Sequence, residues 1–511
     1  MECVLGIDIG SSSVKLGAFA LDGHPICIAT RDYVTEEPRA GWREQDAEVW
    51  WESVAQCARE IQAQIDAREI LGIGCTGHLS SHTFVDQEGR PLRPSLGFQD
   101  QRALRETEEL ASLMSREALA AELEIDLPPA PSWPLPRLMW FRNHEPATLE
   151  KASYLVQAKD FVNFRLTGDF ASDASSNRGL VNFSTGREPE ELLRRLGLPV
   201  RLLPSLYAPH AVIGRISKAA EQATGLPKGL PVVTGWNDLN ASVLGSGTIK
   251  EGDLFDVTGS SEHVGMVTSK PLRLPELTYA PFLEGKNLFY GVISSGGASL
   301  GWYCQTFGIT LEEAAELAVS VAPGAESLFF LPYLNGERSP VWDARAAGAF
   351  VGIRSHHRQG HFVRAVLEGV AFDLFQILEL VESEHGPVAG PIVISGGAAQ
   401  MELWNEIKAN VWRRSCHIVQ TTQTGSLGAA MLAAVGVGAY QDCEAAARGM
   451  ARVAKGPTVV PEISARYRQA YGHFRNLYPS LREHFAQTFT ESVEPDEPER
   501  PSTPQKNSML R

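Results

Sequence analysis

The most constraining feature of this 511-residue chain is a motif in which an apolar run reaches an aspartate and then breaks into small residues. Near the N-terminus it reads GIDIGSSSVK over residues 6–15, and a partial repeat, DVTGSS, spans residues 256–261. Backbone N–H groups can approach an anion closely in both loops because the side chains are small, and serine hydroxyls add donors. Together the loops predict one phosphate held from two sides. Either loop alone is also compatible with an ordinary serine-rich hairpin turn.

The residues around the first loop indicate strands rather than a Walker A motif, and no G-x-x-x-x-G-K-[ST] pattern occurs in the chain. Residues 3–9, 14–20 and 25–33 read as three strands of a meander. Residues 45–68 carry apolar residues at helical spacing, with Asp46 as a candidate cap, and a buried strand is expected over residues 70–75. This order predicts an α/β layer.

The second half of the chain predicts the same scheme. The expected elements are strands between residues 254 and 267, a helix from Ala298, a helix over residues 359–384, a strand over residues 391–394, and helices from Glu402 and Gly425. A chain of this length exceeds the size at which one core stops growing. We therefore expect two domains, residues 1–245 and 246–490, that meet near residues 245–252.

Three segments are expected to lie outside the two cores. Pro and Gly residues predict a linker-like approach to the domain boundary over residues 196–231. The Pro-rich residues 127–131 predict a surface excursion over a cleft. The C-terminal residues 491–511 are rich in Pro, Glu, Ser and Thr and predict a disordered tail.

Composition restricts the partners that this chain can bind. The formal net charge is −15, which argues against nucleic acid and against an anionic membrane surface. An acidic protein that binds a polyphosphate usually neutralises it locally, through a divalent metal ion and N–H groups. The seven cysteines lack C-x-x-C spacing, which is typical of reduced thiols in a cytoplasmic protein rather than a disulfide frame or zinc site. Neither a cleavable leader nor a membrane-spanning run is expected.

Further motifs resemble those of the FGGY family of carbohydrate kinases, in the same order and from the first hairpin to about Tyr440. They are GIDIG at residues 6–10, GWREQ and EVWW within residues 41–51, QDQR at 99–102, GWND at 235–238, LPYLNGERSP at 331–340 with GAFVG at 348–352, SGGA at 395–398 and GSLGAA at 425–430. One such match is weak evidence, but the ordered set is strong.

The resemblance implies two actin-like ATPase (ribonuclease H-like) domains flanking a cleft that holds ATP, Mg²⁺ and a small sugar or polyol. It implies ATP-dependent phosphorylation of an acceptor hydroxyl, with Asp238 as general base and Asp8 facing the metal-bound phosphates. The implied nucleotide contacts are Ser11, Ser12, Ser13, Lys15, Gly259, Ser260, Ser261, Gly297, Gly301, Gly396, Gly397 and Ala398. The implied acceptor contacts are His78, Leu79, Ser80, Asp100, Arg102, Trp236 and Asn237.

The acceptor loop departs from the branch that the chain resembles best, that of xylulose and gluconate kinases. Xylulose kinases carry Gln, Met and His in succession where this chain has His78, Leu79 and Ser80, and glycerol kinases carry Arg-Glu in place of the last two. We therefore expect a small neutral polyhydroxy acceptor of about four to seven carbons, with D-xylulose and glycerol disfavoured. Met401, which stands where some relatives have Asn, puts one hydrogen bond to the base in doubt.

Several of these residues also have a purely structural interpretation. The alternatives are a helix cap for Asp238, a surface ion pair for Asp100 and Arg102, a core aromatic for Trp236, a tight turn for Gly396 and Gly397, and a solvated charge for Lys15. Two other functions stay open for the whole chain. One is an actin- or chaperone-like ATPase without a sugar, and the other is a catalytically inactive sugar sensor. The oligomeric state of the chain is also open, and a homodimer is one alternative.

Overall fold

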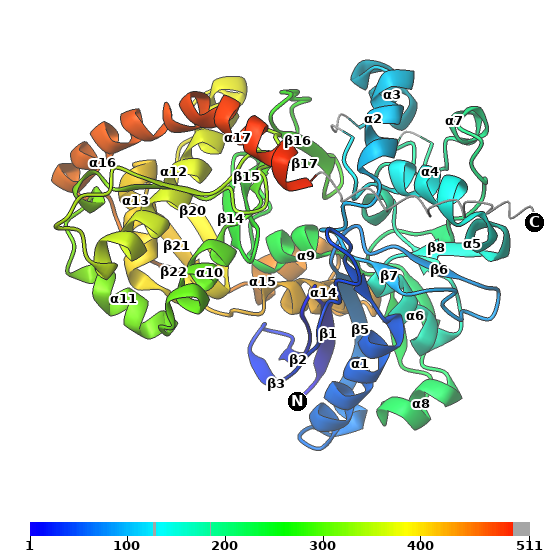
Figure 1. Ribbon diagram of the computed structural model, residues 1–511. Coiled ribbons are helices and arrows are strands. Elements are labelled where there is room, and N and C mark those ends of the chain that lie inside the picture. The colour runs from blue at the N-terminus through cyan, green and yellow to red at the C-terminus, as the bar shows by residue number, and fades with distance from the viewer. Residues whose placement is uncertain (126–128, 184, 494–511) are drawn as a thin grey trace, which may run out of the picture.

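Two mixed sheets of seven strands each form the centre of the computed structural model, which describes residues 1–125, 129–183 and 185–493 (Figure 1). The first sheet has the order β11 (Val212–Arg215), β12 (Pro231–Val233), β5 (Ile70–Gly77), β1 (Cys3–Ile9), β2 (Ser13–Ala20), β3 (Pro25–Asp32), with β13 (Trp236–Asn237) also paired to β5. The second has the order β16 (Thr278–Pro281), β17 (Asn287–Ile293), β15 (Glu262–Thr268), β14 (Leu254–Thr258), β20 (Ile392–Gly396), β21 (Cys416–Val419), β22 (Val453–Lys455).

Helices cover these sheets, and four short strand pairs lie beside them. The pairs are β4 (Glu44–Gln45) with β7 (Ser95–Leu96), β6 (Thr83–Val85) with β8 (Tyr154–Val156), β9 (Ala171–Ser172) with β10 (Ser205–Leu206), and β18 (Phe329–Leu331) with β19 (Ala349–Val351). The helices are α1 (Ala47–Gln62), α2 (Leu104–Leu113), α3 (Arg116–Leu123), α4 (Pro134–His144), α5 (Pro146–Lys151), α6 (Ala158–Thr167), α7 (Glu190–Arg195), α8 (Lys218–Thr224), α9 (Asp238–Gly245), α10 (Gly297–Phe307), α11 (Leu311–Val319), α12 (Gln359–His385), α13 (Glu402–Trp412), α14 (Thr424–Gly436), α15 (Cys443–Met450), α16 (Pro461–Phe474) and α17 (Leu477–Val493).

The centres of the two sheets have the same topology. β1 pairs antiparallel with β2 and parallel with β5, and β14 pairs antiparallel with β15 and parallel with β20. The loops that follow β1 and β14 therefore occupy equivalent places, which confirms the repeated scheme predicted from the sequence. Parallel strands end together at these edges, where α/β sheets bind ligands.

The elements predicted from local patterns are found with small shifts in their ends. β1 matches its predicted bounds, and α1 begins after Asp46, whose side chain accepts a hydrogen bond from the N–H of Glu48. α1 ends at Gln62 rather than at residue 68, because Asp66 caps a separate 3-10 turn over Ala67–Glu69. Near-continuous apolar residues make β1 a central strand that is buried on both faces.

The linker predicted over residues 196–231 is wrong. This segment contains β10, β11, α8 and β12, and β12 pairs with β5 inside the first sheet. Its side chains Ile216, Ala220 and Leu226 are buried in the same core as Trp50 of α1. The Pro and Gly residues mark tight turns between short elements, such as Gly225, which ends α8 with a φ of 76°.

Two other predicted segments lie partly outside the described residues. Residues 126–128, which include the start of the Pro-rich segment, are among them, and so are residues 494–511 of the predicted tail. The described part corrects the start of that tail, because α17 continues to Val493. Within the described ranges, every helix is too short or too polar to span a membrane.

α9, α14 and α15 lie between the two sheets (Figure 1). Phe19 of the first sheet, Tyr290 of the second and Met431 of α14 belong to one buried hydrophobic cluster. α14 approaches the first sheet closely because glycines face it there. A Cβ at Gly6 would lie 1.8 Å from the carbonyl oxygen of Ser426, and one at Gly74 would lie 2.0 Å from that of Ala429.

This packing does not follow the division of the chain at residues 245–252. α9 ends at Gly245, but α14 comes from the second half and completes the core of the first sheet. The two predicted domains therefore share one hydrophobic cluster, and their independence as folding units stays a prediction.

Replacing Gly428 by valine should destabilise the protein by about 1–3 kcal/mol, because overpacking forces buried backbone apart. A Cβ at Gly428 would lie 1.9 Å from the carbonyl oxygen of Ala241 in α9. Denaturant unfolding measures the effect. Gly472→Ala in α16 is the control, since a Cβ there meets nothing within 4 Å, and its stability should be equal or slightly higher. Equal stability of Gly428→Val and wild type would contradict the close contact.

Candidate active site between the two sheets

The first loop places a buried carboxylate beside a lysine. Asp8 and Lys15 are direct cross-strand partners in the β1–β2 hairpin. Burial raises the pKa of Asp8, and the charge of Lys15 opposes that effect. A Cβ at Gly425, the second residue of α14, would lie 2.6 Å from Oδ2 of Asp8, so the helix leaves this carboxylate just enough room. Lys15 is half-buried, which favours the site interpretation over a solvated surface charge.

The turn of that hairpin is held by side chains from the next segment. The amide of Gln45 and the hydroxyl of Thr35 both donate to the carbonyl oxygen of Ser11, at 2.6 and 3.1 Å. The side chain of Ser12 at the tip is exposed, and those of Ser11 and Ser13 are half-buried. The loop is thus fixed by its backbone, while its hydroxyls stay available to a ligand.

The second loop is bonded to two other small-residue turns. The carbonyl oxygen of Gly259 accepts from the N–H of Gly297 at 2.9 Å, and that of Ser260 accepts from Ala298 at 3.1 Å. Oγ1 of Thr258 accepts from the N–H of Ala398 at 3.1 Å. The fold therefore brings most of the predicted nucleotide residues of the second half together.

Gly396 and Gly301 show two different roles for glycine in this region. Gly396 has a φ of 94°, and a Cβ there would lie 2.1 Å from the carbonyl oxygen of Thr258, so the turn needs glycine for its own geometry. The structure thus contains the tight turn that the sequence left as one interpretation. Gly301 lies a turn further along α10, is exposed, and has free space around it. Its contact with a nucleotide stays a prediction.

Asp238 is the first residue of α9, but it does not cap that helix. The cap is Asn237, whose Oδ1 accepts from the N–H of Asn240 at 3.0 Å. Oδ1 of Asp238 accepts from the N–H of Leu239, at 2.8 Å. Burial and the charge of Asp8 raise the pKa of Asp238 to about 6, against the opposing effects of the Leu239 N–H and Arg178. Its carboxylate is therefore free to exchange a proton near neutral pH.

Trp236 and Asn237 are fixed by a serine that sequence reasoning missed. Oγ of Ser175 accepts from Nε1 of Trp236 at 2.6 Å and from Nδ2 of Asn237 at 3.1 Å, and donates to Asp173 at 2.6 Å. Trp236 is 3% exposed and stacks on Phe282 with centroids 5.2 Å apart. This geometry favours the core-aromatic interpretation of Trp236, and contacts of these two residues with an acceptor stay predictions.

A buried lysine holds the segment that carries Ser175. Nζ of Lys159 lies 3.0 Å from Asp173 and 2.6 Å from Asp160, and all three side chains are almost fully buried. A charged residue at a core position of α6 was the signal in the sequence that could have revealed this network.

The acceptor loop contains a histidine with one unpaired nitrogen. Nδ1 of His78 lies 3.0 Å from the carbonyl oxygen of Ile9, which makes it the protonated nitrogen, and Nε2 is buried without a partner among the described residues. Burial lowers the pKa of His78, so the ring is neutral. Nε2 is thus an acceptor suited to a hydroxyl group.

Arg137 was not predicted from the sequence, and its side chain holds the loop that follows His78 in place. It donates to the carbonyl oxygens of Ser80, at 2.6 Å, and of Gly97. Ser80 has a φ of 60°, in the left-handed region, and Leu79 beside it is half-buried. Because Arg137 lies in α4, the shape of this loop depends on a helix from a later part of the chain.

Asp100 and Arg102 form a buried pair rather than a surface one. Their side chains are 0% and 1% exposed, and Arg102 donates to both carboxylate oxygens of Asp100 at 2.8 Å. The N–H of Arg43 also donates to Asp100, at 2.7 Å, and Arg102 lies over the ring of Trp42. Both oxygens are occupied, so the geometry supports a locking role for this loop, and contact with a sugar stays a prediction.

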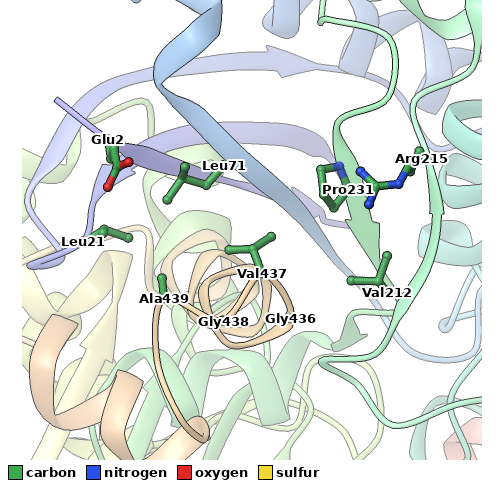
Figure 2. Close-up of a pocket in the computed structure, with 10 residues that line it drawn as sticks. All are labelled: Glu2, Leu21, Leu71, Val212, Arg215, Pro231, Gly436, Val437, Gly438 and Ala439. Atoms are coloured by element: carbon green, nitrogen blue, oxygen red, sulfur yellow. The ribbon is translucent and has the colours of Figure 1, made fainter.

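A separate pocket of about 540 Å³ is lined by residues of the first sheet and by the end of α14 (Figure 2). Its lining includes Glu2, Leu71, Arg215 and Val437, and none of the predicted site residues. It is bounded by the C-terminal end of α14, whereas Asp8 contacts the N-terminal end of that helix. The pocket is therefore distinct from the candidate site.

The residues around Asp8 fit a hard divalent cation. Magnesium prefers carboxylate oxygens and keeps several waters. No hydrogen bond from the described residues reaches the carboxylate of Asp8, and the flanking loops offer small side chains and hydroxyls. A carboxylate oxygen that no protein donor occupies is the kind of ligand that such an ion requires.

Known proteins resemble this chain along most of its length. Xylulose kinase from Lactococcus lactis is 27% identical over 495 residues, which cover 94% of this chain and 98% of that protein. The structure of xylulose kinase from Rhodospirillum rubrum matches with a TM-score of 0.82 and 27% identity, over 95% of this chain and all of that one. Xylulose kinase from Lactobacillus acidophilus, at 23% identity over 96% of this chain and 100% of its own, has a TM-score of 0.87 and shows the same fold.

The fold is that of the actin-like ATPases as found in sugar kinases. The model of the N-terminal domain of the FGGY family of carbohydrate kinases matches residues 3–245, and that of the C-terminal domain matches residues 255–437. The chain therefore belongs to the FGGY family of carbohydrate kinases.

Proposed function

We propose that this chain transfers the γ-phosphoryl group of ATP to a hydroxyl of a small polyhydroxy acceptor, with Asp238 as the general base. The observation that carries the proposal is the state of Asp238. Asn237 takes over the capping of α9, and the pKa of Asp238 is raised to about 6 beside Asp8. A positioned carboxylate near the working pH is well suited to accept a hydroxyl proton.

The two loops support the proposed binding of ATP. Ser11, Ser12, Ser13 and Lys15 would contact the phosphates from the first sheet, and Gly259 to Ser261 would contact them from the second. Asp8 would hold Mg²⁺, directly or through water. When bound, Mg²⁺ neutralises phosphate charge. Because this chain is acidic, it needs such a positive charge where it binds the phosphates. In the transfer, the acceptor oxygen forms a bond to phosphorus, the bond to the ADP oxygen breaks, and the hydroxyl proton passes to Asp238.

We propose a polyhydroxy compound of about four to seven carbons as the acceptor. A site that hydrogen-bonds hydroxyl groups rejects compounds that lack them. The neutral His78 supports this choice, because its unpaired Nε2 can accept a hydrogen bond from a hydroxyl group inside the protein. Several relatives are named xylulose kinases, and one structure of the same fold is named a gluconate kinase. The altered loop of His78, Leu79 and Ser80 supports an acceptor other than D-xylulose.

Replacing Asp238 by asparagine should lower kcat by about 10²–10⁴-fold, because the hydroxyl proton loses its acceptor. ATP affinity should change little, since the phosphate loops are untouched. A coupled ADP-release assay over sugars, polyols and sugar acids measures the effect. Asp169→Asn is the matched control, because that carboxylate is exposed at a distant turn. A variant of Asp238 that keeps a third of wild-type turnover would remove this residue from the mechanism.

The pH profile of kcat/KM should fall on the acidic side with a midpoint near 6. The base works only when it is ionised, and the pKa of Asp238 is about 6 in the free protein. Activity should therefore rise as pH increases through 6 and then level off. An acidic limb centred near pH 4, the range of an ordinary carboxyl, would contradict the raised pKa.

Replacing Ser260 by alanine should weaken ATP binding by about tenfold, because a hydroxyl donor to a charged phosphate is lost. Isothermal titration calorimetry with MgATP measures the change. Ser383→Ala is the control, since that exposed hydroxyl only bonds its own helix α12. Unchanged affinity in the Ser260 variant would mean that the second loop is only a turn.

A further inference from the structure

Three of the 13 histidines of the chain lie within one short run that the proposed mechanism does not use. The run is HHRQGH at residues 356–361, where the chain passes from β19 into α12, and its histidines are His356, His357 and His361. Short histidine-rich tracts are a compositional signal for metal binding, because the neutral imidazole is a common metal ligand. The signal is weak on its own, so the surroundings of the three rings decide what they can do.

The pairing of β18 with β19 brings an acidic residue to these histidines. The two strands are antiparallel, and just beyond the pair a Cβ at Gly352 would collide with the carbonyl oxygen of Ser327. The turn before β18 therefore lies against the segment after β19. Glu326 belongs to that turn. Its Oε2 lies 3.0 Å from Nε2 of His356, and its Oε1 lies 3.7 Å from Nε2 of His361.

The turn that carries Glu326 has an uncommon backbone conformation. Gly324 has a φ of 90°, and the next three residues, Ala325, Glu326 and Ser327, have φ values of 43°, 52° and 68°. Residues other than glycine rarely adopt this left-handed region, and those that do so are often found at ligand-binding sites. Glu368 of α12 holds the turn, because its Oε1 accepts from the N–H of Gly324 at 2.9 Å. The fold thus keeps Glu326 beside the histidines despite an unfavourable backbone conformation.

His357 is the buried member of the group. It is 7% exposed, and its Nε2 has no hydrogen-bond partner among the residues that the structure describes. Glu326, His356 and His357 each offer one ligand atom, and these atoms lie within 4.8 Å of one another. The ligand atoms of a tetrahedral zinc ion are about 3.3 Å apart, given Zn–N distances of about 2.0–2.1 Å. Because the side chains of Glu326 and His356 are about half exposed, both can rotate to close this difference.

The hydrogen bonds of the rings determine which protons move when a metal ion binds. Nδ1 of His357 accepts from the N–H of Arg354 at 3.1 Å, so the ring proton lies on Nε2. When Nε2 binds a metal ion, this proton passes through solvent to Nδ1, and the hydrogen bond to Arg354 breaks. Nδ1 of His361 accepts from the N–H of Arg358 at 3.0 Å, which places a proton on the Nε2 that faces Glu326. His361 therefore orients the carboxylate and is not itself a ligand.

We propose that Glu326, His356 and His357 bind a divalent transition-metal ion of the zinc class, with water in the remaining position. Two imidazole nitrogens and one carboxylate oxygen form a donor set that suits zinc, whereas magnesium prefers oxygen ligands alone. The ion links the turn before β18 to the segment that precedes α12. It therefore stabilises the second half of the chain and takes no part in phosphoryl transfer. This inference does not rest on the proposed function.

The test uses Zn²⁺ as the probe and the full chain after treatment with a chelator. Mg²⁺ is present in excess, so that sites built from oxygen ligands are occupied. Isothermal titration calorimetry should show one Zn²⁺ bound per chain. The unfolding temperature should rise as Zn²⁺ is added, because an ion that binds the folded state preferentially stabilises that state.

Glu326→Gln and His356→Gln should each lower the affinity for Zn²⁺ by about tenfold or more, since each change removes one of three ligands. Both side chains are exposed, so neither substitution disturbs the core. His24→Gln is the matched control, because His24 is an exposed histidine in the turn between β2 and β3. Its substitution should leave the affinity unchanged.

Three outcomes would overturn the inference. If both variants bind Zn²⁺ as tightly as the wild type, the ion is bound elsewhere. If His24→Gln lowers the affinity as much as the two variants do, the ion binds surface histidines without a built site. If the wild type binds no Zn²⁺, and the two substitutions change the unfolding temperature equally with and without Zn²⁺, the group is only a hydrogen-bonded ion pair.

Discussion

The contact of α14 with the first sheet is the constraint on which the rest of the structure depends. Backbone meets backbone there, because Gly6 and Gly74 on the strands lack the Cβ atoms that would collide with the carbonyl oxygens of Ser426 and Ala429 on the helix. Interiors are close-packed, so even one methyl group has to displace something. The seam brings the N-terminal end of α14 against Asp8 and unites the hydrophobic clusters of the two sheets. The candidate site is formed where these elements meet.

Buried charges stabilise the segments on either side of that site in a similar way. In the first half, Lys159 lies between Asp160 and Asp173, which fixes Ser175 and through it Trp236. In the second half, Lys408 of α13 contacts Asp256, at 2.7 Å, and Glu262, the residues that flank the second loop. Removing one member of such a group leaves an uncompensated buried charge, which is costly. Both sets of charges therefore hold the segments that carry the loops in place.

The electrostatic pattern around Asp238 follows from these positions. Burial and Asp8 raise its pKa to about 6, and the charge of Arg178 opposes that rise. Burial and a neighbouring carboxylate favour the protonated form of Asp238, whereas an arginine favours its ionised form. The balance of these effects sets the pKa of the carboxyl. The helix start that would ordinarily use this carboxylate as a cap uses Asn237 instead. Because Asn237 caps the helix, the carboxylate of Asp238 is available for proton transfer.

Local patterns in the sequence determined the hairpins, the two small-residue loops, the cap at Asp46 and the family resemblance. These features depend on residues only a few positions apart, where periodicity and turn chemistry decide the conformation. Tertiary structure alone decided that α14 covers the first sheet, that residues 196–231 are core elements, that Asp100 and Arg102 form a buried pair, and that Ser175 bonds Trp236 and Asn237. The physical reason is that burial and electrostatic environment are set by contacts between segments far apart in the sequence, which no local pattern encodes.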